Sequence, residues 1–168
     1  MPLKRTIEKA REDKRQGKSA STQAGEFVRE EIDKIRHGEH GARSTKQAIA
    51  IGLSEARRAG VDLPPPKRGQ VTDRSRKSAE YAHEAGQGKR KVKRRPRVSR
   101  AVTKALRREP GRSASCVALS RQARSAASRR TAAQRAAAAR KAARNKGAAG
   151  QSAAAKKAAR TRARRKGR

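Results

Sequence analysis

One stretch of the chain combines a helix start, an apolar face and a helix stop, and it spans residues 44–60. Ser44 and Gln47 form an S-x-x-Q pattern, in which each side chain can accept a hydrogen bond from a backbone N–H at the helix start. Gly60 follows two arginines, as expected where a helix closes. Apolar or small residues recur at helical spacing between these ends: Ala48, Ile49, Ile51, Gly52, Leu53 and Ala56.

Gly52 lies on the packing face of this predicted helix, and two interpretations of it stay open. A glycine there lets a second backbone approach closely. It is equally a tolerated glycine, which costs a helix about 1 kcal/mol relative to alanine.

A second amphipathic helix precedes the first, beginning near Ser19–Thr22 and ending near Gly38. Its apolar positions are Ala24, Phe27, Val28, Ile32 and Ile35. The other side carries charged residues, and we expect Glu30, Glu31 and Asp33 to form a solvated face. A short turn over 38–41 joins the two helices, which predicts a helical hairpin whose facing apolar stripes make the core.

The remaining pattern is weaker and predicts short helices. Residues 3–16 read as a short helix, although dense alternating charge would also suit a solvated, fraying arm. Three consecutive prolines at 64–66 form a stiff extended break. Beyond it, helices are predicted over about 72–85 and 98–108, with an amphipathic turn near 117–123. We divide the chain into a helical module (1–63), a proline-containing linker (64–71), a basic region with short helices (72–124) and an Ala/Lys/Arg-rich tail (125–168).

Charge changes this picture toward the C-terminus. The chain of 168 residues has 48 Lys and Arg against 14 Asp and Glu, a net charge of +34. Residues 1–66 are nearly balanced, whereas residues 110–168 hold 18 basic residues and no acidic one. Alanine favours helix in the tail, but like charges four residues apart oppose it. We therefore expect a mostly α protein with a small N-terminal helical hairpin, short helices and a largely disordered or conditionally helical tail, interrupted near Gly147–Gly150.

Enzymatic chemistry finds little support in the sequence, and we expect no enzyme, no cofactor and no metal. Phosphate-binding loops, metal-ligand clusters and nucleophile elbows are missing. His37 and His40 are three residues apart, but we interpret them as polar turn residues rather than metal ligands. Cys116 is the only cysteine, which excludes an intramolecular disulfide and is consistent with a reducing compartment.

The basic residues carry the informative signal, because cations spread along a chain neutralise phosphates and release counterions. Arg95-Pro96-Arg97 is open to two interpretations, an extended minor-groove insertion or a plain basic linker. The near absence of aromatic residues argues against base stacking on single strands. The candidate nucleic-acid-binding residues are Lys89, Arg90, Lys91, Lys93, Arg94, Arg95, Arg97, Arg100, Arg129, Arg130, Arg135, Arg140, Lys141, Arg144, Lys156, Lys157, Arg160, Arg162, Arg164, Arg165 and Lys166.

Two stretches resemble known proteins. Glu39-His40-Gly41 followed by STKQAIAIGLSEA (44–56) resembles a short bacterial domain family of unknown function, found in small basic proteins. That resemblance covers about residues 20–66 and implies no activity. The composition of 125–168 resembles the Lys/Arg/Ala-rich C-terminal tails of histone H1-like bacterial nucleoid proteins.

Together these features predict a nucleoid-associated, histone H1-like protein that binds and compacts duplex DNA without sequence preference. The alternative is a ribosome-associated or RNA-chaperone protein, so RNA stays open as a partner. The hairpin is expected to offer a surface for self-association or a protein partner. No apolar run is long enough to span a membrane, so we expect no membrane partner and a cytoplasmic, nucleoid-associated location.

Overall fold

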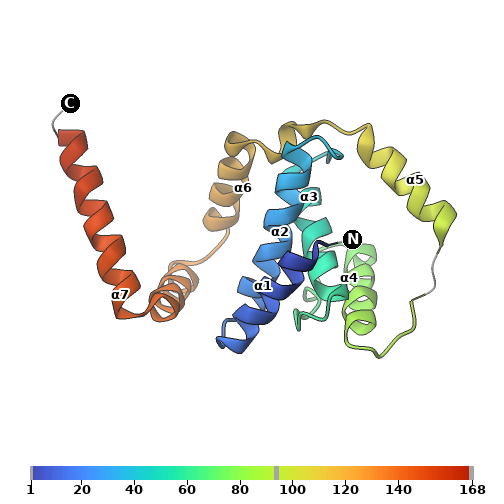
Figure 1. Cartoon of the computed structure of the whole chain (residues 1–168), viewed down its shortest axis with the longest axis horizontal. Helices are drawn as coiled ribbons and strands as arrows, with labels where there is room; N and C mark the ends of the chain where they lie inside the picture. Colours follow the sequence, from blue (N-terminus) through green and yellow to red (C-terminus); the bar gives the residue numbers. More distant parts are fainter. Residues whose placement is uncertain (1, 93–94, 167–168) are drawn as a thin grey trace. The chain divides into compact units, whose positions relative to one another are not determined.

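A computed structural model describes residues 2–92 and 95–166, and helices account for nearly all of its regular structure (Figure 1). The described part contains no strand, only an isolated bridge between Arg68 and Val71. The mostly α fold is therefore confirmed. The helices are α1 (Lys4–Arg15), α2 (Ala20–Arg36), α3 (Thr45–Arg58), α4 (Asp73–Gly86), α5 (Pro96–Arg107), the short 3-10 helix η1 (Gly111–Ala114), α6 (Cys116–Ser128) and α7 (Ala132–Lys166).

The predicted hairpin is present, with α2 and α3 packed along their lengths. Ser44 is the N-cap of α3, and its hydroxyl accepts a hydrogen bond from the Gln47 amide at 3.2 Å. The Gln47 side chain accepts in turn from the amide of Arg43, one residue before the cap, at 2.9 Å. Gly38 and Gly60 have positive φ angles of 77° and 91°, which suit a glycine just after a helix end.

Gly52 is where α2 and α3 come closest. A Cβ added at Gly52 would lie 2.7 Å from Val28 Cα and 2.9 Å from Val28 N. The structure therefore supports a close backbone approach at this glycine and not a merely tolerated one. Phe27 and Ile35, on either side of this contact along α2, are among the largest fully buried side chains.

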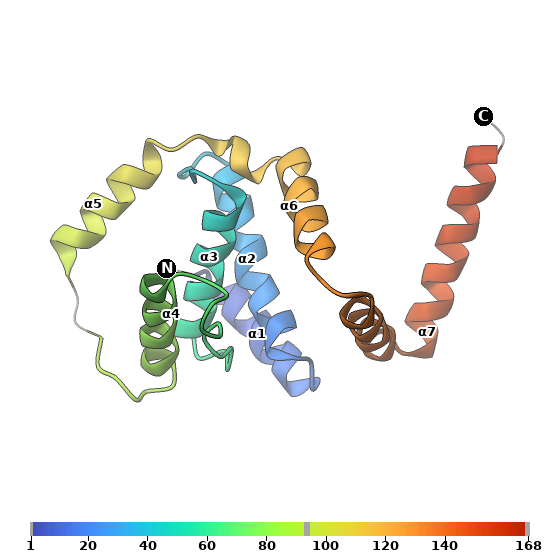
Figure 2. The ribbon, with the colours of Figure 1, turned by 180° about the vertical axis from the view of Figure 1, so that it is seen from behind.

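Three more elements cover the hairpin within the same chain. Helix α1 packs on α2 and α4 packs on α3, as Figures 1 and 2 show. Gly86 of α4 lies so close to α3 that an added Cβ would overlap the Arg57 carbonyl. The N-terminal segment is thus a packed helix and not a fraying arm, with Ala10 buried in the core.

The third element that packs on the hairpin is η1, which the sequence pattern does not place in the core. Ala114 of η1 is fully buried against a cluster that contains Ile35 and Ala48. Thr45 donates its hydroxyl hydrogen bond to the Ser113 carbonyl at 2.7 Å, and the Gly41 amide donates to the Leu106 carbonyl at 2.9 Å. The hairpin core therefore depends on residues about 70 positions further along the chain.

The basic region contains one further correction. Pro96 is the first residue of α5, and Arg95 is its N-cap, so Arg97 is helical. The interpretation of Arg95-Pro96-Arg97 as an extended insertion is wrong, because proline in the first helical turn loses no hydrogen bond and its fixed φ suits the helix.

The structure does not support a disordered tail, since α7 runs over Ala132–Lys166. Alanine propensity accounts for the helix, and Thr131 and Gln134 form a reciprocal capping box at its start, with hydrogen bonds of 3.1 and 3.2 Å. The predicted interruption is present: Gly147 has φ 64° and ψ 173°, which separates two helical segments (Figure 1). The described chain forms two compact units, Met1–Ala123 and Arg124–Arg168.

The contact at Gly52 yields a test of the fold. Gly52→Ala should lower the free energy of unfolding by about 2 kcal/mol, because the new methyl group forces the two backbones apart. Gly25→Ala is the matched control, since a Cβ there meets nothing within 4 Å and the site is also helical. The control should gain about 1 kcal/mol from alanine propensity. Urea denaturation of both variants checks this, and equal stabilities would contradict the close approach.

Candidate nucleic-acid interface

Helix α2 draws acidic side chains into the core, which corrects the expectation of a solvated face. Glu30 is 6% exposed, and its carboxylate pairs with Lys34 Nζ at 2.5 Å and accepts the Leu3 amide at 3.1 Å. Burial alone would raise the pKa of Glu30, but hydrogen bonds from Lys34, Thr6 and Leu3 outweigh it and lower that pKa. The carboxylate thus ties α1 to α2.

Glu31 is the most deeply buried charge, with 1% of its surface exposed. It lies one helical turn from both Phe27 and Ile35 on α2. Its Oε1 atom lies 3.6 Å from His40 Nε2 and has no hydrogen-bond partner. Burial raises the pKa of Glu31, and this effect outweighs the attraction of His40. Asp33, by contrast, is half-buried and faces Arg36 at 4.0 Å.

The buried carboxylates of α2 do not belong to a metal-binding group among the described residues. Among the described residues, no three His, Cys, Asp or Glu side chains converge on a common point. His40 faces Glu31, while His37 is exposed at the end of α2. Cys116 is exposed, with its sulfur 3.6 Å from an Arg36 guanidinium nitrogen. We interpret the cluster as structural.

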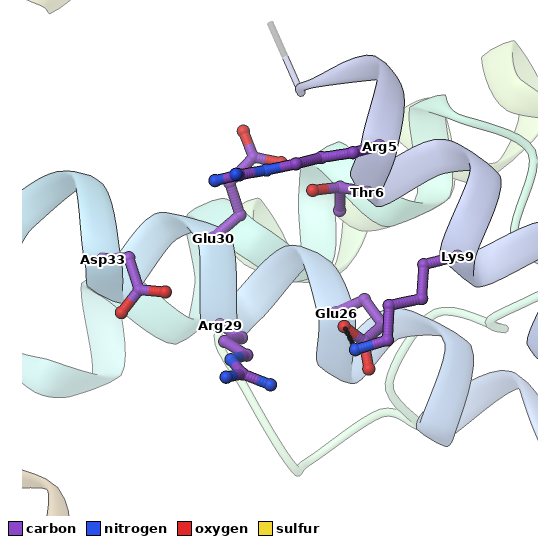
Figure 3. Close-up of a pocket in the computed structure, with 7 residues that line it drawn as sticks. All are labelled: Arg5, Thr6, Lys9, Glu26, Arg29, Glu30 and Asp33. Atoms are coloured by element: carbon purple, nitrogen blue, oxygen red, sulfur yellow. Dashed lines mark ion pairs between the residues drawn. The ribbon is translucent and has the colours of Figure 1, made fainter.

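A shallow hollow of about 320 Å³ lies between α1 and α2 (Figure 3). Lys9 and Glu26 pair across it at 2.8 Å. Three cationic and three acidic side chains line it together with Thr6, so it offers no consistent charge to a ligand. The charged lining residues are Arg5, Lys9, Arg29, Glu26, Glu30 and Asp33.

The first group of predicted binding residues lies between α4 and the middle of α5, and every described member is exposed: Lys89, Arg90, Lys91, Arg95, Arg97 and Arg100. Arg90 already has two partners within the chain. Its Nε atom lies 2.8 Å from a Glu84 carboxylate oxygen, and its Cζ atom lies 5.1 Å from the centroid of the Tyr81 ring. Lys93 and Arg94 lie outside the described residues.

Helix α5 adds three candidate residues that the sequence analysis does not name, Lys104, Arg107 and Arg108. Arg97, Arg100, Lys104, Arg107 and Arg108 recur at spacings of three, four, three and one, which places them along one side of the helix. All five are exposed. The spacing was available in the sequence, but it has meaning only once a helix over these residues is established.

The second group lies in the unit Arg124–Arg168, and its described side chains are all exposed. Arg135 is partly occupied, since its guanidinium donates to the Arg130 carbonyl at 2.7 Å. Arg165 and Lys166 are in the helical backbone of α7, and their side chains lie outside the description. The exposed members are Arg129, Arg130, Arg135, Arg140, Lys141, Arg144, Lys156, Lys157, Arg160, Arg162 and Arg164.

Comparison with known proteins identifies only part of the chain. Residues 11–68 match the model of DUF6496, a family of unknown function. The match supports a short domain of unknown function, as the block around Ser44–Ala56 predicts, and covers about a third of the chain. It runs from within α1 through α2, α3 and the prolines, and it carries no activity. No curated protein and no solved structure matches the chain.

No described helix is both long enough and apolar enough to cross a bilayer.

The raised pKa of Glu31 yields a test of the buried cluster. In the folded chain Glu31 holds its proton to higher pH than in the unfolded chain, so its ionisation opposes folding as pH rises from about 4.5 through the folded-state pKa. Glu31→Gln should therefore be more stable than the parent at neutral pH. The difference should shrink as pH falls and vanish below the ordinary value, where Glu31 is protonated in both states.

Thermal unfolding across pH measures this difference, and Glu39→Gln, which alters an exposed carboxylate in the α2–α3 loop, is the control. His40, Glu55, Lys34 and Glu30 surround position 31 in both variants. A difference that grows toward acid pH would contradict the assignment.

Proposed function

We propose that the chain binds duplex DNA without sequence preference and compacts it, as a nucleoid-associated protein. The observation that carries the proposal is the C-terminal charge: 18 basic residues and no acidic one over residues 110–168. From Ala132 onward the described arginines and lysines are exposed on helical backbone, and no Asp or Glu of their own segment competes for them. This is the arrangement expected of a polycation that neutralises a phosphate backbone.

The helical form of the tail suits this role. Arg140, Lys141 and Arg144 share one side of the first segment of α7, and Lys156, Lys157 and Arg160 share one side of the second, because an α-helix turns about 100° per residue. Each segment can turn its cations toward one run of phosphates. Phosphates also remove the like-charge repulsion at i,i+4, so DNA binding stabilises the helix it binds. The break at Gly147 lets the two segments follow different directions along the duplex.

The aromatic residues favour duplex over single strands. Phe27 is fully buried in the module, and the ring of Tyr81 is covered on one face by Arg90. Base stacking requires exposed aromatic faces. Phe27 offers no platform, and the one partly covered ring of Tyr81 cannot stack successive bases, so contacts to the phosphate backbone dominate.

Salt dependence tests the mechanism. Contacts to on the order of ten phosphates give a slope of roughly −9 in a plot of log binding constant against log salt concentration. A four-residue tail variant should flatten that slope by about 4. The four substitutions to glutamine in that variant are Arg140, Arg144, Lys156 and Arg160.

A module variant with the same loss of charge is the control. Its four substitutions to glutamine fall on exposed residues of α1, α2, the α2–α3 loop and the start of α3, namely Arg11, Arg29, Arg43 and Lys46. Its slope should stay near that of the parent. Equal flattening in both variants, or a parent slope shallower than about −3, would refute a tail-based polyelectrolyte mechanism.

Competition decides between DNA and the RNA alternative. Duplex DNA and a structured RNA are offered at equal phosphate concentration, and the fraction of each that is bound is measured at several salt concentrations. We expect the duplex DNA to be retained at the higher salt concentrations. Preferential retention of the RNA would instead support a ribosome-associated or RNA-chaperone role.

A further inference from the structure

Helix α5 has two chemically distinct sides. Its cations Arg97, Arg100, Lys104, Arg107 and Arg108 occupy one side, as described above. Val98, Val102, Ala105 and Leu106 fall on the opposite side, because these positions are separated by four, three and one residues. Helix α5 contains no acidic residue. Such a helix normally buries its apolar side against a core.

The described structure leaves the apolar side of α5 uncovered. The helix has no buried residue, and Val98 and Val102 are 54% and 52% exposed. Two further exposed apolar residues lie near its start, Tyr81 at 38% and Val92 at 57%. Tyr81, Val92 and Val98 line one open hollow together with Arg58, Arg90 and Arg95. Apolar side chains and arginines thus form one continuous mixed surface.

The segment that carries α5 is held to the module at both ends. Before it, Gly86 packs against the Arg57 carbonyl of α3. After it, the Leu106 carbonyl accepts the Gly41 amide at 2.9 Å, and Ala114 is buried. We call residues 87–109 the basic strap. Its valines are exposed although the residues that flank it, Gly86 and Ala114, pack against the module.

Two other occupants, duplex DNA and a second copy of α5, each match only one side of this helix. Duplex DNA would engage the arginines but leave the valines in water, because the DNA surface that meets them is polar. A second copy of α5 on the apolar side would double the local positive charge and bring no anion to either row of cations. A surface that uses both sides must present negative charge with hydrocarbon just beneath it.

We propose that α5 binds anionic lipid bilayers, lying in the plane of the membrane surface. The valines then enter the hydrocarbon boundary, while the long arginine and lysine side chains reach back to the lipid phosphates. Tyr81 and Val92 extend the apolar contact, and Arg90 and Arg95 extend the charged one. This interaction is separate from DNA binding by the tail and stands or falls independently of it.

A single tryptophan tests the insertion directly, because the chain contains none. Val102→Trp in the full chain is mixed with phosphatidylglycerol-containing vesicles and with pure phosphatidylcholine vesicles. Its fluorescence should shift to the blue with the anionic vesicles only. Val117→Trp is the matched control, because Val117 is 67% exposed on α6, outside the strap. An unshifted Val102→Trp spectrum, or equal shifts at both positions, would overturn the proposal.

Isosteric substitution separates insertion from plain charge attraction. The double variant V98T/V102T keeps every cation and the side-chain shape, and should weaken partition into anionic vesicles roughly tenfold. V71T/V117T makes the same chemical change at two exposed valines elsewhere, and should partition like the parent. The affinity of V98T/V102T for duplex DNA should be unchanged. Unaltered vesicle partition of V98T/V102T would show that charge alone draws the chain to the membrane, and would overturn the proposal.

Discussion

The close approach of α2 and α3 at Gly52 is the constraint on which the module depends. Only a residue without a Cβ allows the Val28 backbone to lie this near, and that proximity closes the core around Phe27 and Ile35. The positions of α3 and its flanking loops then decide where the other elements pack. The Arg57 carbonyl at the end of α3 receives Gly86 of α4, and the loop before α3 receives the backbone of Leu106–Ala114.

Charge is the second constraint, because a chain with so few large apolar residues cannot fill a core with hydrocarbon alone. The module places acidic side chains inside instead. Glu30 stabilises the α1–α2 packing through Lys34 and the Leu3 amide, whereas the buried Glu31 opposes folding when it is ionised. The module therefore holds buried carboxylates close to its own cations, as Glu30 lies beside Lys34.

The cations outside the module fall into two structurally different sets. Those of the strap belong to a segment that is packed at both ends, and α5 orders them along one side of a helix with apolar residues opposite. Those of the tail lie on helical segments whose described side chains are all exposed. A row of cations opposite apolar residues suits a membrane surface, where phosphates lie above hydrocarbon. A long exposed polycation suits the repeating phosphates of a duplex. The two proposals rest on this difference.

Local patterns in the sequence determined the helices of the hairpin and their ends. Ser44 with Gln47, Gly38 and Gly60 each act through interactions within a few residues, so α2 and α3 could be predicted. The break at Gly147 followed from glycine alone. Repulsion between like charges predicts a largely disordered tail. The tail is instead helical over α7, because the helix propensity of alanine outweighs that repulsion.

Contacts between distant residues were decided only by the tertiary structure. Glu31 lies one turn from Phe27 and Ile35, but this spacing alone did not show that its carboxylate is buried, because its burial depends on α3 packing across α2. Nothing near Ala114 indicates that it fills the hairpin core about 70 residues away. The row of cations on α5 was visible as a spacing, yet its exposed valines became informative only when the fold left them uncovered. Spacing is a local property of the chain, whereas burial depends on which distant surfaces meet.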